Sequence, residues 1–377
     1  MQFRDLKKQY EVLKQDIDAV IQAVIDSTSF ISGKQVLELE KELAEYVGVK
    51  HCISCANGTD ALSLALMAWN VGPGDAVFVP DFTFFASGEV VSFEGATPIF
   101  VDVEEDTFNI SAVSLEQAIK KVLEEGRLIP KVVVAVDLFG QPADYDKILP
   151  IVRKYDLKLL EDSAQGFGGS IRGKRACCFG DIATTSFFPA KPLGCYGDGG
   201  AIFTNDDDIA ALLLSFRVHG KGGDKYDNVR IGMNSRLDTI QAAILQVKFK
   251  AFKEYEVEDV NKVAARYTEY LADFVKVPYV PEEFCSSWAQ YSILLKDAEE
   301  RNALQAYLKS HGIPSMVYYP KPMHLQTAFA DCDCVKVDLS VTGSLCERVL
   351  ALPIHPYLQV KEQDVVIEAV REFIQSK

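Results

Sequence analysis

One loop of the chain combines a lysine with an unusual concentration of proline and glycine. It reads Ser186-Phe187-Phe188-Pro189-Ala190-Lys191-Pro192-Leu193-Gly194-Cys195-Tyr196-Gly197-Asp198-Gly199-Gly200. Pro192 biases the residue before it away from the helical conformation, so the Lys191 side chain projects from an extended backbone with rigid neighbours. Four of the seven residues from 194 to 200 are glycines, which leaves room for a planar group. A lysine held in this way can lose its proton and act as a nucleophile in Schiff-base chemistry, and we favour this interpretation over an ordinary surface loop.

Seven short apolar segments around this loop are predicted to be strands. They are 51–55, 76–80, 98–103, 132–136, 158–161, 182–187 and 201–204. Most are continuous apolar runs, which are typical of strands covered on both faces. Amphipathic helices are expected between them, for example over 35–47 and 60–69. The pattern therefore predicts an α/β fold with a mostly parallel central sheet, in which ligands gather at the carboxyl ends of the strands.

The character of the sequence changes after a long predicted helix over 238–258. The remainder has fewer glycines, and we expect a strand at 288–295, a proline-rich segment at 314–322, and helices near 299–310 and 361–375. This arrangement predicts a large domain over residues 1–249, which includes the N-terminal segment, and a smaller α/β domain over 250–377.

Three further segments place polar side chains beside the predicted strands. Ala56-Asn57-Gly58-Thr59-Asp60 enters a helix whose first turn offers free N–H groups to an anion, although an ordinary N-cap turn has the same pattern. In Glu161-Asp162-Ser163-Ala164-Gln165-Gly166, Asp162 directly follows a buried strand and suits a cationic ring nitrogen, or else caps a helix. The segment Arg230-Ile231-Gly232-Met233-Asn234-Ser235-Arg236-Leu237-Asp238 supplies an amide and a guanidinium just before the long helix.

Charge and composition limit the partners of the protein. The 377 residues include 39 Lys and Arg against 54 Asp and Glu, a formal net charge of −15, so we expect neither nucleic acid nor an anionic membrane surface as a partner. No apolar run approaches the roughly 20 residues that cross a bilayer, and the first residues do not resemble a secretion signal, so a cytoplasmic location is expected. The cysteines lack paired metal-ligand spacing, and no metal site is predicted.

Taken together, four strings resemble the DegT/DnrJ/EryC1/StrS family of pyridoxal-phosphate-dependent nucleotide-sugar aminotransferases. They are Asn57-Gly58-Thr59-Asp60-Ala61-Leu62, Glu161-Asp162-Ser163-Ala164-Gln165, the lysine loop quoted above, and Asn234-Ser235-Arg236-Leu237. The resemblance covers essentially the entire chain in the order and spacing of the family. It implies the aspartate aminotransferase fold, which is fold type I of the pyridoxal phosphate enzymes.

The resemblance also implies which residues contact the cofactor ring. Lys191 would bind pyridoxal phosphate covalently and later carry the proton between the sugar carbon and the cofactor. Asp162 would pair with the pyridine nitrogen and Gln165 would face the ring hydroxyl. Phe84 would stack on the ring, although a position in the hydrophobic core stays open for it.

The phosphate contacts implied by the resemblance come from two subunits. Gly58, Thr59 and Ser186 would hold the phosphate within one chain, and Asn234 would reach across from a second subunit. A site shared in this way requires a homodimer.

The substrates implied by the resemblance are an amino donor, usually L-glutamate, and a nucleotide-linked keto-sugar. Within the family, the quoted motifs most resemble the branch that aminates C3 of UDP-2-acetamido-2-deoxy-ribo-hex-3-uluronate. The product of that branch is used to make surface polysaccharide such as lipopolysaccharide O-antigen. Arg236 is placed to hold a uronate carboxylate, or else forms an ion pair at the start of a helix.

Further sugar contacts implied by the resemblance are Phe30, Ser32, Ala190, Tyr318 and Tyr319. Ala190 and Tyr318 depart from that branch, in which a serine and a histidine are expected. A different UDP- or dTDP-linked sugar, neutral or with a C4 ketone, therefore stays open as the substrate. The third alternative is a regulator that binds pyridoxal phosphate without turnover.

Overall fold

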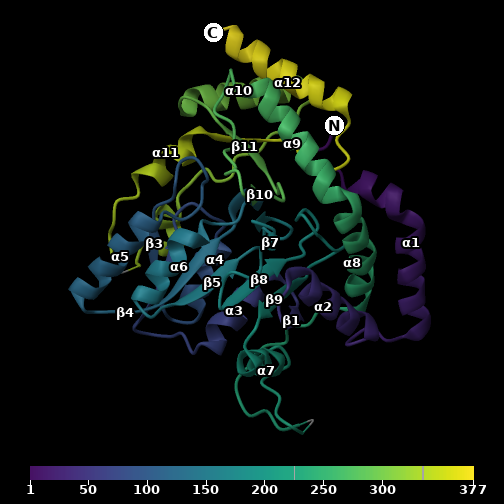
Figure 1. Ribbon diagram of the computed structural model, residues 1–377, viewed down its shortest axis with the longest axis vertical. Helices are drawn as coiled ribbons and strands as arrows, with labels where there is room; N and C mark the ends of the chain where they lie inside the picture. The colour runs from purple at the N-terminus through teal and green to yellow at the C-terminus, as the bar shows by residue number, and fades with distance from the viewer. Residues whose placement is uncertain (225, 333–334) are drawn as a thin grey trace.

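A seven-stranded sheet forms the centre of the computed structural model, which describes residues 1–224, 226–332 and 335–377 (Figure 1). β9 pairs antiparallel with both of its neighbours, and the other four pairings are parallel. All seven predicted strands lie in this sheet, so the predicted α/β class with a mostly parallel sheet is confirmed. In spatial order the strands are β1 (His51–Cys55), β9 (Gly200–Thr204), β8 (Ile182–Ser186), β5 (Lys158–Asp162), β4 (Ile129–Val136), β2 (Asp75–Pro80) and β3 (Thr97–Val101).

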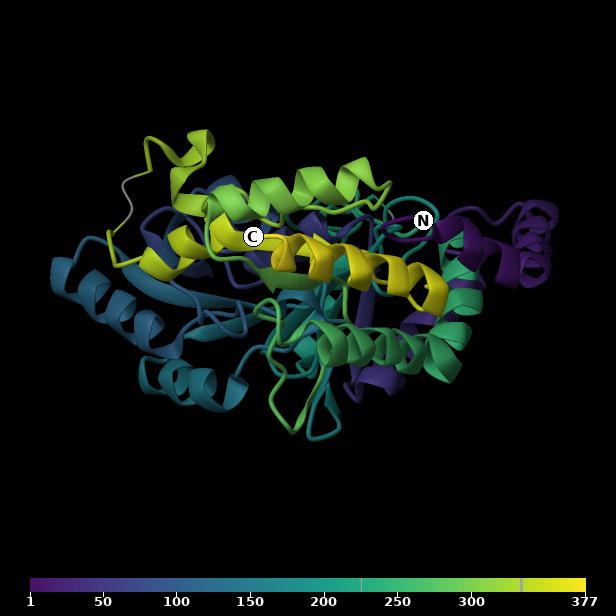
Figure 2. The ribbon, with the colours of Figure 1, turned by 90° about the horizontal axis from the view of Figure 1, so that it is seen from above.

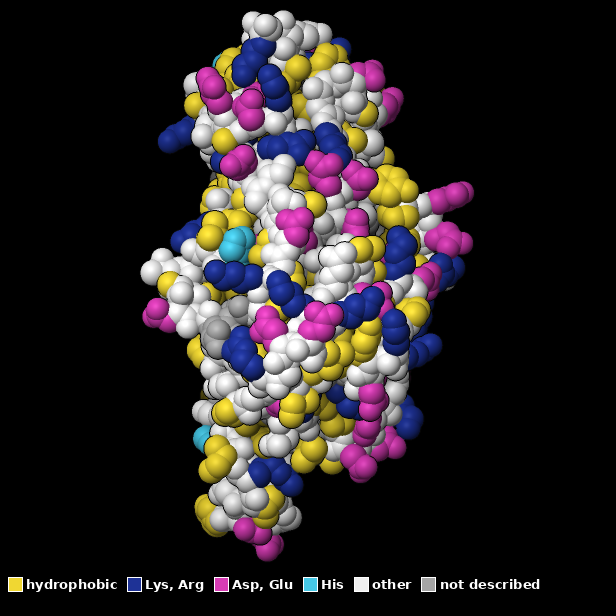
Figure 3. Space-filling model, turned by 90° about the vertical axis from the view of Figure 1, so that its left-hand side faces the viewer, with side chains coloured by type: hydrophobic (Ala, Val, Ile, Leu, Met, Phe, Trp, Pro, Cys, Tyr) yellow, Lys and Arg dark blue, Asp and Glu magenta, His cyan; other side chains and the backbone are white. Residues whose placement is uncertain are grey.

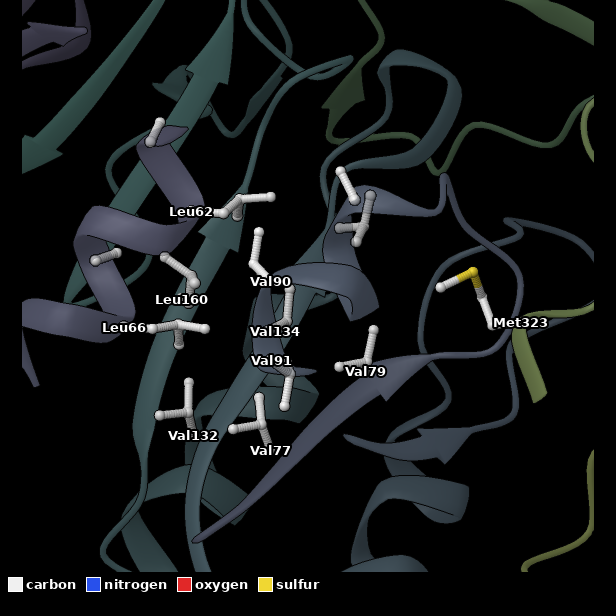
Figure 4. Packing of buried hydrophobic residues seen from close by; sticks show 14 of the residues in the cluster. Leu62, Leu66, Val77, Val79, Val90, Val91, Val132, Val134, Leu160 and Met323 are labelled. Atoms are coloured by element: carbon white, nitrogen blue, oxygen red, sulfur yellow. The ribbon is translucent and has the colours of Figure 1, made fainter. Parts of the chain in front are cut away.

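Helices cover both faces of the sheet, which explains the continuous apolar strands. On one face, α3 (Gly58–Ala68), α4 (Ala86–Phe93) and α7 (Asp207–Phe216) pack against alternate residues such as Val132 and Val134. Figure 4 shows these valines beside side chains of α3 and α4. The intervening Val133 and Ala135 point to the other face, where they meet α5 (Ala112–Glu125) and α6 (Tyr145–Lys154). α2 (Lys34–Val47) and α8 (Thr239–Ala251) complete that second face.

A long helical segment extends past the end predicted for it at residue 258. α8 continues through a π-helical turn (Phe252–Glu256) into α9 (Val257–Leu271). The helix persists because Val260, Val263, Ala264, Tyr267 and Leu271 continue the apolar stripe and are all buried. α1 (Leu6–Ser27) packs along α8, at the right of Figure 1.

A second hydrophobic core begins at Val260 and belongs to the C-terminal part of the chain. β11 (Tyr291–Leu294) and β12 (Val349–Leu352) pair antiparallel, and α9, α10 (Ala298–Ser310) and α12 (Val360–Gln375) pack around them (Figure 2). The strand and the two helices predicted in this region are therefore present. The long helix crosses the expected domain boundary at 249/250 without a break, and that boundary stays a prediction.

Several short elements connect the two cores. The strands β10 (Phe284–Cys285), β6 (Ser170–Ile171) and β7 (Lys174–Arg175) form a small sheet between them. α11 (Ser340–Arg348) returns to the large core through Leu345 and Cys346. Short 3-10 helices lie at Leu138–Gly140, Met323–Leu325 and Thr327–Phe329.

Acidic and basic side chains are interspersed over the face drawn in Figure 3. No helix of the described ranges is long and apolar enough to cross a membrane.

Candidate active site

The first turn of α3 forms an anion cradle at the end of β1. The Asn57 side chain accepts a hydrogen bond from the Asp60 N–H at 2.8 Å, while Gly58 and Thr59 occupy the part of the turn whose N–H groups have no partner within a helix. The N-cap and the anion cradle therefore coexist. A Cβ at Gly58 would lie 2.7 Å from Cβ of Ser186, so only glycine allows the end of β8 to come this close.

A buried serine that the sequence analysis missed ties the cradle to the segment before α8. Ser235 donates a hydrogen bond to Asp60 at 2.6 Å and accepts one from the Ala56 N–H at 3.1 Å. The neighbouring Asn234 is exposed. No local sequence signal reveals this contact, because the partners lie 175 and 179 residues apart.

Asp162 is the last residue of β5 and is buried opposite Thr184 of β8. Its Oδ2 accepts a hydrogen bond from the Ser87 hydroxyl at 2.8 Å, and its Oδ1 accepts one from the Ala164 N–H at 3.2 Å. Burial raises the pKa of Asp162, whereas these two hydrogen bonds and the nearby Lys191 oppose that rise. Ser87, on α4, is a second residue that the sequence analysis did not identify.

Lys191 lies in the loop after β8. In the sheet β8 is the neighbour of β5, the strand that ends at Asp162. The loop is tightly folded, since the Lys191 N–H donates to the Phe188 carbonyl and the Cys195 N–H donates to the Phe187 carbonyl, both at 2.8 Å. Burial lowers the pKa of the Lys191 amine to about 8, although the Asp162 carboxylate favours the ammonium form. A lysine with this pKa supplies far more neutral amine near pH 7 than an ordinary lysine does.

The glycines of the lysine loop have a different role from the one expected. A Cβ at Gly194 would lie 2.5 Å from the Pro189 carbonyl oxygen, and a Cβ at Gly200 would lie 2.5 Å from the Asn57 carbonyl oxygen. These glycines let the loop pack against itself and against the anion cradle. The expectation that they leave room for a planar group is therefore wrong at these positions.

An exposed aromatic ring stands near the same end of the sheet. Phe84 is 55% exposed, and its ring centroid lies 6.4 Å from that of Tyr319. The Tyr319 hydroxyl accepts a hydrogen bond from Gln165 Nε2 at 3.0 Å, while Gln165 Oε1 accepts one from the Phe139 N–H at 2.7 Å. The alternative that Phe84 belongs to the hydrophobic core does not hold. Tyr318 packs instead toward Phe3, with ring centroids 6.2 Å apart.

Two fully buried carboxyl groups belong to neighbours of Asp162: Glu161 precedes it in β5, and the Asp137 N–H donates to its carbonyl oxygen at 3.0 Å. Glu161 accepts hydrogen bonds from the backbone N–H groups of Phe179 at 2.7 Å and Gly180 at 3.0 Å. The Ser163 hydroxyl contacts both Glu161 and Asp137. Because a hydroxyl has one proton, both contacts are satisfied when Asp137 is protonated and donates to Ser163, which then donates to Glu161. Burial and the negative charge of Glu161 raise the pKa of Asp137 well above its usual range.

Two residues predicted to contact sugar line a separate cavity of about 970 Å³. Ser32 and Arg236 share it with His219, Lys221 and Arg230, and no Asp or Glu is among its described lining residues. Arg236 makes no ion pair with any described residue, so the expected alternative of an ion pair at the helix start does not hold.

The remaining predicted sugar contacts lie outside this cavity. Phe30 is 45% exposed in the segment that precedes Ser32. Ala190 is exposed beside Lys191, and Tyr318 and Tyr319 lie in the segment described with Phe84. The structure therefore divides the predicted substrate residues between two places in one chain.

The groups at the ends of β1, β5 and β8 fit pyridoxal phosphate. Gly58 and Thr59 offer N–H groups to a phosphate, and Asp162 offers a buried carboxylate to a cationic ring nitrogen. Lys191 supplies an amine of lowered pKa, and the exposed face of Phe84 is available to a flat ring.

Comparisons with known proteins agree with this donor set. The model of the DegT/DnrJ/EryC1/StrS aminotransferase family matches residues 11–371. A UDP-2-acetamido-2-deoxy-3-oxo-D-glucuronate aminotransferase of Pseudomonas aeruginosa is 44% identical over 371 residues, which cover 98% of this chain and 99% of the relative.

Solved structures extend the comparison to the fold and the cofactor. A DegT DnrJ EryC1 StrS aminotransferase from Brucella abortus superposes with a TM-score of 0.96 at 49% identity, covering 99% of both chains. A Streptococcus pneumoniae protein assigned as a sugar aminotransferase and solved in its PLP form has a TM-score of 0.88 at 25% identity, and the match covers 96% of both chains.

Proposed function

The chain belongs to the DegT/DnrJ/EryC1/StrS aminotransferase family, and we propose that it transfers an amino group from L-glutamate to C3 of UDP-2-acetamido-2-deoxy-ribo-hex-3-uluronate. It is a pyridoxal-phosphate-dependent sugar aminotransferase. The observation that carries the aminotransferase part of the proposal is that Lys191, with its lowered pKa, and the buried Asp162 follow adjacent strands at the same end of the sheet and influence each other electrostatically. The amino sugar produced would serve surface polysaccharide synthesis in the cytoplasm.

We propose that residues at the ends of three strands bind the cofactor. Gly58, Thr59 and Ser186 bind the phosphate, and Asp162 faces the ring nitrogen. Pyridoxal phosphate, when bound, supplies a cationic ring that withdraws electron density from the carbon bonded to nitrogen. The Ser87 hydroxyl and the Ala164 N–H orient Asp162 and favour its charged form, which keeps that nitrogen protonated.

We assign the proton transfers of the reaction to Lys191. Its amine has a pKa of about 8, close to the working pH, so Nζ can take a proton from the donor carbon and return one to the sugar carbon. The same group serves both halves of the reaction, because the second half is the chemical reverse of the first.

Arg236 is the residue that we assign to the uronate carboxylate. Its guanidinium makes no ion pair with the described residues and lines a cavity that carries Lys221 and Arg230, with no acidic side chain among the described lining residues. A guanidinium binds a carboxylate through two parallel hydrogen bonds, and the other cations suit a diphosphate.

A homodimer with shared sites would bring the cavity around Arg236 of one subunit close to the cofactor end of the sheet of the other. Asn234 is exposed, and Val229 and Ile231 of the same protruding segment are 53% and 88% exposed. Figure 1 shows this segment extending below α7, away from the chain's own sheet. Apolar side chains at such positions are typical of a surface that a second subunit covers.

The aminotransferase assignment is tested by following the absorbance of the bound cofactor when glutamate is added. We expect conversion of the aldehyde form to the amine form, with release of 2-oxoglutarate. A cofactor that stays in its aldehyde form with glutamate and with a panel of other amino acids would favour the regulator without turnover.

The sugar assignment is tested with matched 3-keto and 4-keto sugars, UDP- and dTDP-linked, with and without a C6 carboxylate. We expect the 3-keto uronate to be preferred and Arg236→Gln to lower its kcat/KM about tenfold or more, while turnover of neutral sugars changes little. Arg230→Gln is the matched comparison, because it removes the same charge from the same cavity; since Arg230 is assigned to the diphosphate, its loss should affect sugars with and without the carboxylate equally. Equal turnover with and without the carboxylate would contradict the role of Arg236 and favour a neutral sugar.

A further inference from the structure

The N-terminal segment contacts the backbone of the lysine loop. Arg4 Nη2 donates to the carbonyl oxygen of Lys191 at 2.9 Å and to that of Pro192 at 3.4 Å. These contacts span 187 and 188 residues of sequence, and no motif points to them.

The backbone on both sides of Arg4 is fixed. The carboxylate of Asp5 accepts from the Lys8 N–H at 2.8 Å and caps α1, and the carbonyl of Phe3 accepts from the Ile354 N–H at 3.3 Å. Arg4 is therefore held between the start of α1 and the C-terminal core, with its guanidinium directed at the lysine loop.

Charged groups of both signs surround Arg4. Glu256 and Asp5 are its acidic neighbours, while Lys248 and His355 face it as bases. Burial lowers the pKa of Lys248 to about 8 and that of His355 to about 4, and the charge of Arg4 adds to both effects. Burial likewise lowers the pKa of Arg4 to about 10. A guanidinium stays charged at neutral pH even in this environment.

We propose that Arg4 is a positioning residue for Lys191. Arg4 holds the backbone of the lysine loop through two carbonyl groups and places a positive charge near the Lys191 amine. This inference rests on the proposed role of Lys191 in catalysis. The Lys191 N–H is already used by the Phe188 carbonyl and Pro192 has no N–H, so the carbonyl oxygens of residues 191 and 192 are the backbone groups that an outside segment can bind here.

Two charged groups act on the Lys191 amine from the elements packed around it. Asp162, from β5, favours the ammonium form, and Arg4, from the N-terminal segment, opposes it. Removing the charge at residue 4 should therefore raise the pKa of Lys191, because one of the two opposing influences is lost.

The test uses the full-length holoenzyme and three variants. Arg4→Gln keeps a donor and removes the charge, and Arg4→Lys keeps the charge and loses the planar fork. Lys7→Gln removes an exposed charge from the same segment. The two measurements are the pH midpoint of the absorbance of the bound cofactor and the hydrogen exchange of peptides covering residues 187–199.

For Arg4→Gln we expect the midpoint to rise by about half a unit or more. For Arg4→Lys we expect a midpoint near that of the wild type, with exchange in the lysine loop several-fold faster. Lys7→Gln should match the wild type in both measurements, and thermal unfolding identifies any variant that fails to fold.

Two results would overturn the inference. If the pH midpoint of the cofactor absorbance in Arg4→Gln equals that of the wild type, the charge of Arg4 does not act on Lys191. If hydrogen exchange of residues 187–199 in both Arg4 variants equals that of the wild type, Arg4 does not position the loop. Neither measurement needs turnover of a sugar. A wild-type protein that binds no cofactor would therefore contradict the proposed function, while hydrogen exchange would still test the role of Arg4.

Discussion

The cofactor end of the sheet and the cavity around Arg236 are built in opposite ways. At the ends of β5 and β8, Asp162 is buried and each of its carboxylate oxygens has a hydrogen-bond donor. Around Arg236, loop residues such as Ser32 and Lys221 are exposed, and several cations lie together without an acidic partner among the described lining residues. Under the proposed function, the buried groups of one chain would fix the general chemistry, and the exposed loops around Arg236 would select the substrate together with a second subunit.

The same comparison explains how an acidic protein can bind anionic ligands. The net charge of −15 describes the whole chain, but the anion cradle at Gly58 and Thr59 depends on N–H groups at a helix start. The cavity around Arg236 gathers Lys221 and Arg230 without an acidic side chain among its described lining residues. Local geometry therefore outweighs the overall sign of the field.

The largest effect is expected from Lys191→Ala at the cofactor end. Loss of the amine that moves the proton should lower the rate of the glutamate half-reaction by at least about 10³-fold. The measurement is the conversion of the cofactor absorbance after addition of glutamate. Lys296→Ala, which changes an exposed lysine of the C-terminal part, is the matched control and should react like the wild type. A Lys191→Ala variant with retained amino transfer would refute the assigned role.

A smaller loss is expected from Asp162→Asn. A neutral amide cannot stabilise a positive ring nitrogen, so the half-reaction should slow by on the order of 10²-fold while the cofactor stays bound. Stopped-flow absorbance with glutamate measures the rate, and equilibrium dialysis measures cofactor binding. Ser87→Ala, which removes one donor to Asp162, should show a milder loss in the same direction. Unchanged rates in Asp162→Asn would contradict the comparison, because the cofactor end would then tolerate the loss of its central charge.

The two buried carboxyl groups of Glu161 and Asp137 should respond differently to substitution by the corresponding amide. In Glu161→Gln, an amide N–H would face the backbone N–H groups of Phe179 and Gly180, which should cost about 2–3 kcal/mol in the free energy of unfolding. Asp137→Asn should be tolerated, because an amide reproduces the donor and acceptor of a protonated carboxyl. Denaturant unfolding of the two variants measures the difference, and equal losses would contradict the assignment of the proton to Asp137.

The pH dependence of stability follows from the same pair. Folding raises the pKa of Asp137, so its contribution is complete below the ordinary carboxyl pKa of about 4 and is lost as the pH rises through the raised value. Asp137→Asn stays neutral at every pH. Its stability relative to the wild type should therefore increase as the pH rises above about 4, as measured by unfolding at several pH values. A difference that stays constant with pH would show that Asp137 is ionised in the folded protein.

The smallest effect is expected at the exposed cavity. Lys221→Gln should raise the KM for the nucleotide sugar by only about threefold and leave kcat unchanged, because an exposed charge is screened by water and salt. Lys296→Gln is the control for the loss of one surface charge. The effect should fade at high ionic strength. A large loss of kcat in Lys221→Gln would place this loop in the chemical step and erase the distinction between the two regions.

Residues separated by long stretches of chain explain most of what the sequence analysis missed. Ser87, Ser235 and Asp137 reach the site through contacts that only the folded chain creates. The glycines of the lysine loop were recognised as significant, but their role was misjudged, because the atoms that approach Gly194 and Gly200 come from the folded loop and from Asn57.

The sequence by itself determined the seven strands and the family, and it singled out Lys191 as the predicted catalytic residue, because continuous apolar runs and short motifs are local features that a linear chain displays. The tertiary structure decided which polar groups are paired, since pairing depends on distance in space. It showed that Ser87 donates a hydrogen bond to Asp162, that Ser163 joins two buried carboxyl groups, and that Arg4 donates to the carbonyl oxygen of Lys191. Burial and neighbouring charge set the pKa of Lys191, and neither can be read from the order of residues.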